Sequence, residues 1–417
     1  MHKKTERHCC FVLSLCILLI VGSLPCRSVW AADTMKIGIL TATLPGGKGI
    51  ENAARMAADE INGAGGILGK EIELVYGNAK DKPIIGAYEY TRLAEKEKVT
   101  AVLGPASSEI ALKIMEQVPR CKVPFLVIGA GTPKVGEEVA KDPEKYRQVF
   151  KVFHNSYEMG QFTTEWIVKE LIIPRKMKKA ALAVESAVWA LPLARAWKTE
   201  MEKAGCEVVI HEYFDYHTKD FFPIVRKINQ SGADALIVAF ARTDPTAFVR
   251  LWADQQGPVM AGIIGLFQVL GKNAGEKSFS TVSMAYPGVF GLTARDSLFC
   301  EKYLLRFKSR PEYTSAYTYD AMHILKNALE RAGSAESGAL TGGMEQTDYE
   351  GIMGRWVFDP VSHDPKFGPG YRRFMMVQWQ PPGKLCCIWP EEMKNCDLIF
   401  PPWYQENNQA AGKQNPE

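Results

Sequence analysis

The chain has 417 residues, of which 47% are apolar and 23% charged, and a formal net charge of +3 at pH 7. This composition excludes a disordered or fibrous protein, and the length gives room for two domains with sizeable cores. The first 31 residues hold four of the 50 basic and one of the 47 acidic residues, which leaves 46 of each sign beyond them. Nothing in this balance favours binding to nucleic acid or to an anionic membrane surface.

The N-terminus reads as an export signal. Basic residues among the first seven precede the apolar run FVLSLCILLIVGSL, and small residues follow it. This pattern predicts a signal peptide over residues 1–31, cleaved before Ala32, and therefore a periplasmic protein. The apolar run is short for a membrane-spanning helix, so an uncleaved anchor is the alternative. Cys26 follows Leu-Pro, which is a poor context for lipidation.

Strand and helix patterns then alternate. Apolar residues recur at helical spacing from Ile50 to Ile61, stop at a run of glycines, and change to period two at Ile72, Leu74 and Tyr76. Strands are predicted at 36–42, 71–76, 100–104 and 124–128, with helices at 50–62, 83–98 and 109–118. A β-α-β-α succession predicts a parallel sheet with helices on both faces.

A second round of the same pattern begins near residue 150. Strands are predicted at 180–184, 206–214, 234–240 and 259–265, and helices at 156–171, 193–204, from 220, and from 245. Beyond residue 285, helices are predicted at 294–308 and 316–332, no helix is assigned to the glycine-rich GALTGGMEQ, and short strands are expected at 354–359, 371–380 and 386–389. The fold class is therefore α/β with two lobes of similar size, and the tail is expected to complete both.

Six cysteines lie beyond the signal: Cys121, Cys206, Cys300, Cys386, Cys387 and Cys396. In an oxidising compartment, Cys396 paired with Cys386 or Cys387 would close a short loop, and the sequence does not decide between them. A metal site made of these three is the alternative, although no histidine completes it at ligand spacing.

Motifs for chemistry are missing. Gly46-Gly47-Lys48-Gly49 lacks the spacing of a phosphate loop, so a turn is the better interpretation, and no nucleophile elbow or His-Glu-x-x-His motif occurs. The sequence predicts no enzyme, no cofactor and no metal. An exported α/β hydrolase is the rival class, and it would require Ser108 to lie near His154 or His211.

Seven stretches together resemble the type I periplasmic substrate-binding proteins, in the branch of leucine/isoleucine/valine-binding proteins of ATP-driven importers. They are KIGILTA, AADEINGAGGILGKEIELV, AVLGPASSEIAL, VPFLVIGAGTP, TYDAMHILKNALERAG, FDPVSHDPKFGPG and QWQPPGK. The resemblance implies two Rossmann-like lobes joined by three crossovers, near Lys151, Ser283 and Phe358, that close on a ligand. It divides the chain into an N-terminal lobe (32–151 plus 284–357), a C-terminal lobe (152–283 plus 358–405) and a polar tail (406–417).

The first lobe offers an anion site. Ser108 follows the third strand where a helix begins, so its hydroxyl and free backbone N–H groups point outward. The N–H groups of Ala130 to Thr132 and the Thr132 hydroxyl follow the fourth strand. The resemblance places Ser108, Gly131 and Thr132 on the family's carboxylate-binding positions. The alternative is that Ser108 only caps its helix and Thr132 only closes a turn.

The second lobe departs from the amino-acid-binding pattern. The family's acid for the ligand ammonium aligns with Ile264, and a buried ammonium without a counter-charge is costly. Two tyrosines of the family align with Trp189 and with Ala241, and Phe240 and Arg242 flank Ala241. A further tyrosine of the family is retained here as Tyr319. Trp189 and Phe240 are expected in the wall of the pocket, and the alternative is that they are ordinary core residues. For Arg242 there are two interpretations: it replaces the missing acid and reverses the preferred ligand charge, or it is an ordinary surface charge.

The predicted function follows from these residues. We expect a monomeric receptor that captures a small carboxylate, more readily an aliphatic or aromatic acid than an amino acid, and delivers it to a membrane permease. A sensory module of the same fold is the alternative.

Overall fold

The computed structural model describes residues 34–43, 46–291 and 293–405. The predicted signal peptide, its cleavage site and the tail 406–417 lie outside the described residues. Among those described, no helix combines the length and the apolar character needed to span a bilayer.

The first sheet is wholly parallel, in the order β2-β1-β3-β4-β5. Its strands are β1 Met35–Thr41, β2 Ile72–Asn78, β3 Ala101–Gly104, β4 Phe125–Val127 and β5 Val149–Lys151. Its connecting helices are α1 Gly47–Gly63, α2 Pro83–Thr91 with the π-helical turn η1 Arg92–Lys96, α3 Ser108–Met115, α4 Val118–Cys121, α5 Lys134–Lys141 and α6 Pro143–Tyr146. The predicted parallel sheet is confirmed.

The second sheet is also parallel, in the order β7-β6-β8-β9. Its strands are β6 Lys179–Glu185, β7 Glu207–Phe214, β8 Ala235–Phe240 and β9 Val259–Ile264. Its helices are α7 Ser156–Trp166 with the π-helical turn η2 Ile167–Ile172, α8 Ala190–Lys203, α9 Phe222–Gln230, α10 Thr246–Asp254 and α11 Phe267–Ala274, followed by the 3₁₀ turn η3 Gly275–Ser278.

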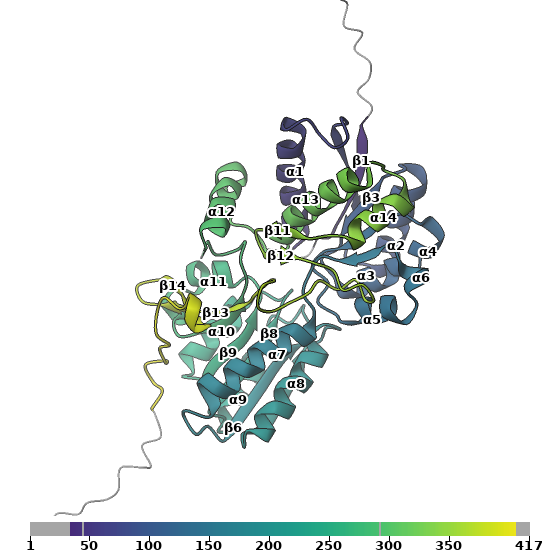
Figure 1. The fold of residues 1–417 in the computed structure, drawn as a ribbon. Coiled ribbons are helices and arrows are strands. Elements are labelled where there is room, and N and C mark those ends of the chain that lie inside the picture. The colour runs from purple at the N-terminus through teal and green to yellow at the C-terminus, as the bar shows by residue number, and fades with distance from the viewer. Residues whose placement is uncertain (1–33, 44–45, 292, 406–417) are drawn as a thin grey trace, which may run out of the picture. The chain divides into compact units, whose positions relative to one another are not determined.

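The remaining elements belong to the last third of the chain. They are β10 Val282–Ala285, α12 Ala294–Phe307, α13 Ser315–Ala332, α14 Ser337–Glu345, β11 Tyr349–Gly351, β12 Gly354–Trp356, β13 Met375–Gln380, β14 Lys384–Trp389 and the 3₁₀ turn η4 Glu391–Met393. Helix α13 lies beside α1 in the first lobe (Figure 1). Strands β10, β13 and β14 form an antiparallel sheet, and β10 runs next to β9 of the second lobe.

The buried side chains show why the chain changes lobe three times. Trp356 and Phe358 pack into the core of β1, α1 and α13, whereas Met376 and Ile388 pack with β6 and α8. The chain therefore crosses between β5 and α7, between β10 and α12, and between β12 and β13. The three crossovers are confirmed, and the residue boundaries assigned to the lobes stay predictions.

Helix α14 corrects the sequence analysis. No helix is predicted over GALTGGMEQ, yet residues 337–345 are helical. The Glu336 carboxylate accepts hydrogen bonds from the N–H groups of Gly338 and Ala339, which caps the helix. Leu340 and Met344 lie one turn apart and are fully buried. Capping and burial offset the helix-weakening effect of the glycines.

The cysteine alternatives resolve into one disulfide, between Cys386 and Cys396. Cys387 is free and buried, so the pairing of Cys396 with Cys387 is wrong. Within the described ranges no cluster of His, Cys, Asp or Glu could hold a metal ion, and the disulfide removes two of the three ligands that the alternative metal site requires.

Candidate functional site

A cavity of about 90 Å³ opens where the carboxyl ends of the two parallel sheets face each other. Ligands of open α/β sheets bind at such strand ends. The cavity is lined from the first lobe by Ala106, Ser107, Ser108, Gly129, Gly131 and Tyr313, from the second lobe by Met159, Trp189, Phe240, Ala241, Arg242, Ile263, Ile264, Gly265 and Met284, and from the crossovers by Phe153, His154 and Tyr286. One water needs about 10–15 Å³, so the cavity has room for a small molecule.

Ser108 connects two strand ends of the first lobe. It is the first residue of α3, and its Oγ accepts a hydrogen bond from the Thr132 N–H at 3.3 Å. The capping position belongs to Ser107, whose side chain makes no capping bond. Ser108 therefore does not cap the helix, and among the described residues its hydroxyl proton has no acceptor. That proton is available to a group in the cavity.

Thr132 and Ala130 lie behind the cavity wall. Both are fully buried, and neither lines the cavity. The Thr132 hydroxyl accepts the N–H of Lys134 at 3.3 Å, which closes a turn as the alternative interpretation expects. Gly131 does line the cavity, and a Cβ there would lie 3.3 Å from the Cβ of Trp189, so its lack of a side chain lets the second lobe approach.

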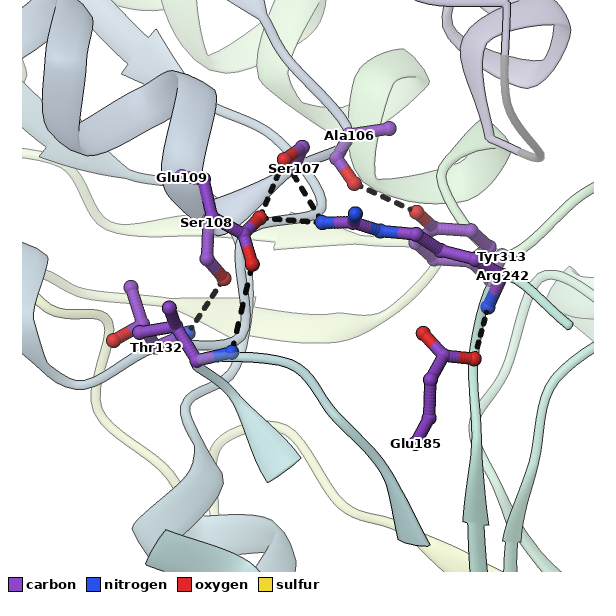
Figure 2. Close-up of polar contacts among 9 residues, drawn as sticks. Ala106, Ser107, Ser108, Glu109, Thr132, Glu185, Arg242 and Tyr313 are labelled. Atoms are coloured by element: carbon purple, nitrogen blue, oxygen red, sulfur yellow. Dashed lines mark hydrogen bonds and ion pairs between the residues drawn. The ribbon is translucent and has the colours of Figure 1, made fainter. Parts of the chain in front are cut away.

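A charged contact joins the two lobes beside Ser108 (Figure 2). The Arg242 guanidinium, after β8, donates from Nη2 to the Glu109 carboxylate and to Ser107 Oγ at 3.1 Å. Ser107 donates to the same carboxylate at 2.8 Å, and the Val188 N–H lies 3.5 Å from its other oxygen. We call Ser107, Ser108, Glu109 and Arg242 the ionic cluster.

Both members of the ion pair are held in their charged forms. Burial raises the pKa of Glu109, but attraction by Arg242 and hydrogen bonds, including one from Ser107, outweigh it, so this pKa is lowered. Burial lowers the pKa of Arg242, and the Glu109 carboxylate more than restores it. The pKa of each group therefore moves in the direction that favours ionisation.

Glu185, at the end of β6, fixes the loop that carries Arg242. Its side chain is fully buried, and one oxygen accepts the N–H groups of Ala241, Arg242 and Thr243 at 3.0–3.1 Å. The sequence analysis did not single out Glu109 or Glu185. The available signals were an acid directly after Ser107-Ser108 and an acid ending a buried strand.

Apart from Arg242, the second lobe's side chains at the cavity are apolar. Trp189, Phe240 and Ile264 all line the cavity and are nearly or fully buried. Phe240 also packs against Phe214, with ring centroids 5.0 Å apart, so it is a core residue and a wall residue at once. No carboxylate lines the cavity among the described residues, including at the position of Ile264.

Tyr319 does not line this cavity. Its hydroxyl donates to the Glu60 carboxylate of α1, and its ring borders a separate depression with Phe299 and Tyr349. The Tyr317 side chain points towards the crossovers. Because successive residues of a helix are about 100° apart, the side chain of Tyr319, two positions later on α13, points about 200° away from it. Tyr313, just before α13, lines the cavity instead and donates to the Ala106 carbonyl at 3.0 Å.

Aromatic rings from all three crossovers meet at another side of the cavity. His154 packs against Phe153, Tyr286 and Phe374, with ring centroids 3.9, 5.3 and 5.0 Å away, and its Nδ1 lies 2.7 Å from the Tyr317 hydroxyl oxygen. We call these five residues the aromatic cluster. Burial holds the pKa of His154 well below its ordinary value, so the ring is neutral at pH 7.

The arrangement needed for nucleophilic catalysis is missing from the described residues. The hydrogen bond of Ser108 is to Thr132, and that of His154 is to Tyr317. His211 lies on β7, with its ring tilted against that of Tyr213, and outside the cavity. Ser108 therefore has no hydrogen-bonded base, which a serine nucleophile requires.

Comparisons with known proteins agree with this geometry. Residues 36–384 match the family described as periplasmic binding protein. Leu/Ile/Val-binding protein homolog 7 of Brucella suis biovar 1 is 23% identical, over 83% of this chain and 88% of that protein.

Two solved structures share the fold. A branched-chain amino acid transporter substrate-binding protein from Streptococcus pneumoniae, in complex with isoleucine, has a TM-score of 0.73 at 22% identity, covering 88% of this chain and all of that one. An ABC transporter solute-binding protein from Rhodopseudomonas palustris BisB5, in complex with 3,4-dihydroxybenzoic acid, has a TM-score of 0.75 at 20% identity, covering 89% and 99%. The chain belongs to the periplasmic binding protein family, as a type I solute-binding receptor of the leucine/isoleucine/valine-binding type and not an enzyme.

Proposed function

We propose that this protein captures a small monocarboxylic acid in the cavity between its lobes and presents it to the permease of an ABC-type importer. The observation that carries the proposal is the convergence of the Ser108 hydroxyl and the Arg242 guanidinium on a cavity whose other walls are mainly apolar and aromatic. Arg242 uses Nη2 for Glu109 and Ser107. Its Nε–H and Nη1–H groups have no hydrogen-bond partner among the described residues, so they can donate to a ligand carboxylate.

An acid without an amino group fits this cavity better than an amino acid. A buried ammonium needs an acceptor or a counter-charge, and Ile264 stands at the position of the family's acid. The Glu109 carboxylate, next to the cavity residues Ser107 and Ser108, already accepts hydrogen bonds from Arg242 and Ser107. Isoleucine and 3,4-dihydroxybenzoic acid in the solved relatives show that this fold accommodates both kinds of ligand.

Delivery to a permease requires that the bound form differ from the free form. The contact between Glu109 of α3 and Arg242 after β8 joins the lobes, so it forms only when they close. A carboxylate held by Ser108 and Arg242 would touch both lobes at once. We therefore expect the ligand to shift the receptor towards the closed form, which the permease would recognise.

A thermal-shift screen of the exported chain tests the ligand class. Aliphatic and aromatic monocarboxylic acids should raise the melting temperature in a concentration-dependent way, because a ligand that binds only the folded state stabilises it. Their neutral amides are the matched controls and should have no effect. If only α-amino acids raise the melting temperature, or if amides act as well as acids, the proposal is wrong.

Transport is tested separately, with the best acid from the screen in radiolabelled form. Uptake into the native cells should fall when the gene for this protein is deleted and return when it is restored. Unchanged uptake would favour a sensory role for the same binding site.

A further inference from the structure

The aromatic cluster presents to the cavity two polar side chains whose hydrogen-bonding capacity is not fully used by the described residues. His154 and Tyr286 both line the cavity, with ring centroids 5.3 Å apart. Resting on the proposed function, we infer that these two side chains bind an uncharged oxygen of the ligand, so that the preferred ligands are hydroxy- or oxo-monocarboxylic acids. The carboxylate lies at the ionic cluster and the second oxygen lies at the aromatic cluster.

His154 offers a hydrogen-bond donor to the cavity. The hydroxyl of Tyr317, which is fully buried, has His154 Nδ1 as its hydrogen-bond partner among the described residues. A buried donor without an acceptor is costly, which favours donation of the Tyr317 proton to Nδ1. A neutral ring then carries its own proton on Nε2. Within the described chain Nε2 has no partner, so this N–H is free to donate to a ligand.

Tyr286 complements that donor. Its hydroxyl has no hydrogen bond to any described residue, and burial raises its pKa well above the ordinary value, so it keeps its proton. A keto oxygen could accept from both Nε2–H and the tyrosine hydroxyl. A ligand hydroxyl could accept from His154 and donate to Tyr286. Either a keto oxygen or a hydroxyl of the ligand would make the hydrogen bonds that His154 and Tyr286 leave unmade.

Charge limits the second group to a neutral one. Among the described residues that line the cavity, Arg242 is the only cation that is charged at neutral pH, and it belongs to the ionic cluster. A second carboxylate at the aromatic cluster would be buried against a neutral imidazole and aromatic rings without a counter-charge. An ammonium would meet the Nε2–H donor. A dicarboxylate and an amino acid are therefore both disfavoured.

Aromatic rings connect the two clusters along the cavity wall. Tyr313 bonds to Ala106, next to the ionic cluster, and its ring centroid lies 6.1 Å from that of Phe153. Phe153 in turn packs on His154 with centroids 3.9 Å apart. A ligand that spans both clusters would carry its second oxygen away from the carboxylate, with apolar carbons beside the rings of Tyr313 and Phe153.

Titration calorimetry with matched ligand pairs tests this inference. The pairs are benzoate with 4-hydroxybenzoate, and pentanoate with 4-oxopentanoate. In at least one pair the wild-type protein should bind the oxygenated acid about tenfold more tightly, and Tyr286→Phe should reduce that ratio by about tenfold through loss of one or two hydrogen bonds. Tyr157→Phe, an exposed tyrosine outside the cavity, is the control and should leave the ratio unchanged.

The outcomes separate this inference from the proposed function. If the acids bind but the oxygenated members bind no more tightly, or if Tyr286→Phe leaves the ratio unchanged, the oxygen site is wrong and the carboxylate site stands. If no monocarboxylic acid binds, both are wrong. His154→Gln is a second variant for the same ratio and should also lower it.

Discussion

The ionic cluster and the aromatic cluster line one cavity but are built differently. Glu109 and Arg242 come from opposite lobes, so their contact depends on closure. His154, Tyr286 and Phe374 come from the crossovers, which stay connected in any arrangement of the lobes. Affinity and closure are therefore coupled at the ionic cluster, whereas the aromatic cluster can select among ligands without driving closure.

The largest effect is expected when the cation is removed. Arg242→Met leaves the partly buried Glu109 without its partner and facing the ligand carboxylate. Truncating one member of a desolvated charge pair costs about 2–5 kcal/mol of binding free energy, so calorimetry should show carboxylate affinity falling by at least about thirtyfold. Arg242→Met combined with Glu109→Gln should recover part of the loss, since the uncompensated charge is gone.

Arg226→Met supplies the control for that measurement. Arg226 is an exposed arginine of α9, outside the cavity. Its replacement should leave affinity unchanged. Equal dissociation constants for wild-type protein and Arg242→Met would remove Arg242 from the binding site and restrict the ionic cluster to a contact between lobes.

A smaller loss is expected at the hydroxyl of the same cluster. Ser108→Ala removes a donor to the carboxylate, and hydrogen bonds to charged groups contribute about 1.5–3 kcal/mol. The dissociation constant should rise, and the melting temperature of the free protein should fall as well, because the buried Thr132 N–H loses its acceptor. Ser334→Ala, outside the cavity, is the matched control. An unaltered dissociation constant for Ser108→Ala would place the ligand elsewhere in the cavity.

The aromatic cluster should be distinguished by pH. His154 is neutral in the folded protein, but in the unfolded chain it takes up a proton as the pH falls below about 6.5. Below that pH the unfolded chain binds more protons than the folded protein, and this proton binding stabilises the unfolded state. The free energy of unfolding therefore falls by up to about 1.4 kcal/mol for each pH unit of acidification. His154→Phe removes this contribution.

Urea unfolding at about pH 7.5 and about pH 5.5 measures that difference. The wild-type protein should lose more stability between the two values than His154→Phe does. Other histidines with lowered pKa, such as His323 and His363, act equally in both proteins. Glu109 has a lowered pKa, so its contribution is present above its ordinary value and is lost only in a more acidic range. Identical losses in both proteins would contradict a neutral His154.

Local patterns were sufficient to predict much of the fold. The change of period between α1 and β2 and the alternation of strands and helices follow from neighbouring residues. Helix α14 was missed because its capping by Glu336 and the burial of Leu340 outweigh its glycines. The choice of Cys386 over Cys387 depends on how β14 faces the chain around Cys396, which spacing alone does not encode.

Residues of the site could be predicted where their position just after a strand decides whether they face the cavity. Ser108, Gly131, Trp189, Phe240, Arg242 and Ile264 line the cavity, while Ala130 and Thr132 stand just behind it. Glu109 was missed because its role depends on Arg242, 133 residues away in the sequence. A place for His154 in the cavity wall is not predictable from its neighbours in sequence, since its ring environment is assembled from three distant segments.

The smallest effect on binding is expected at Tyr319. Its hydroxyl donates to Glu60 on the far side of α13, so Tyr319→Phe removes a hydrogen bond within the first lobe and nothing from the cavity. The stability of the free protein should fall by about 0.5–1.5 kcal/mol, whereas carboxylate affinity should be unchanged. Unfolding and calorimetry on the same preparation separate the two effects. A marked loss of affinity with unchanged stability would mean that the resemblance to the family locates this tyrosine better than its position on α13 does, and that the lobes rearrange around the ligand.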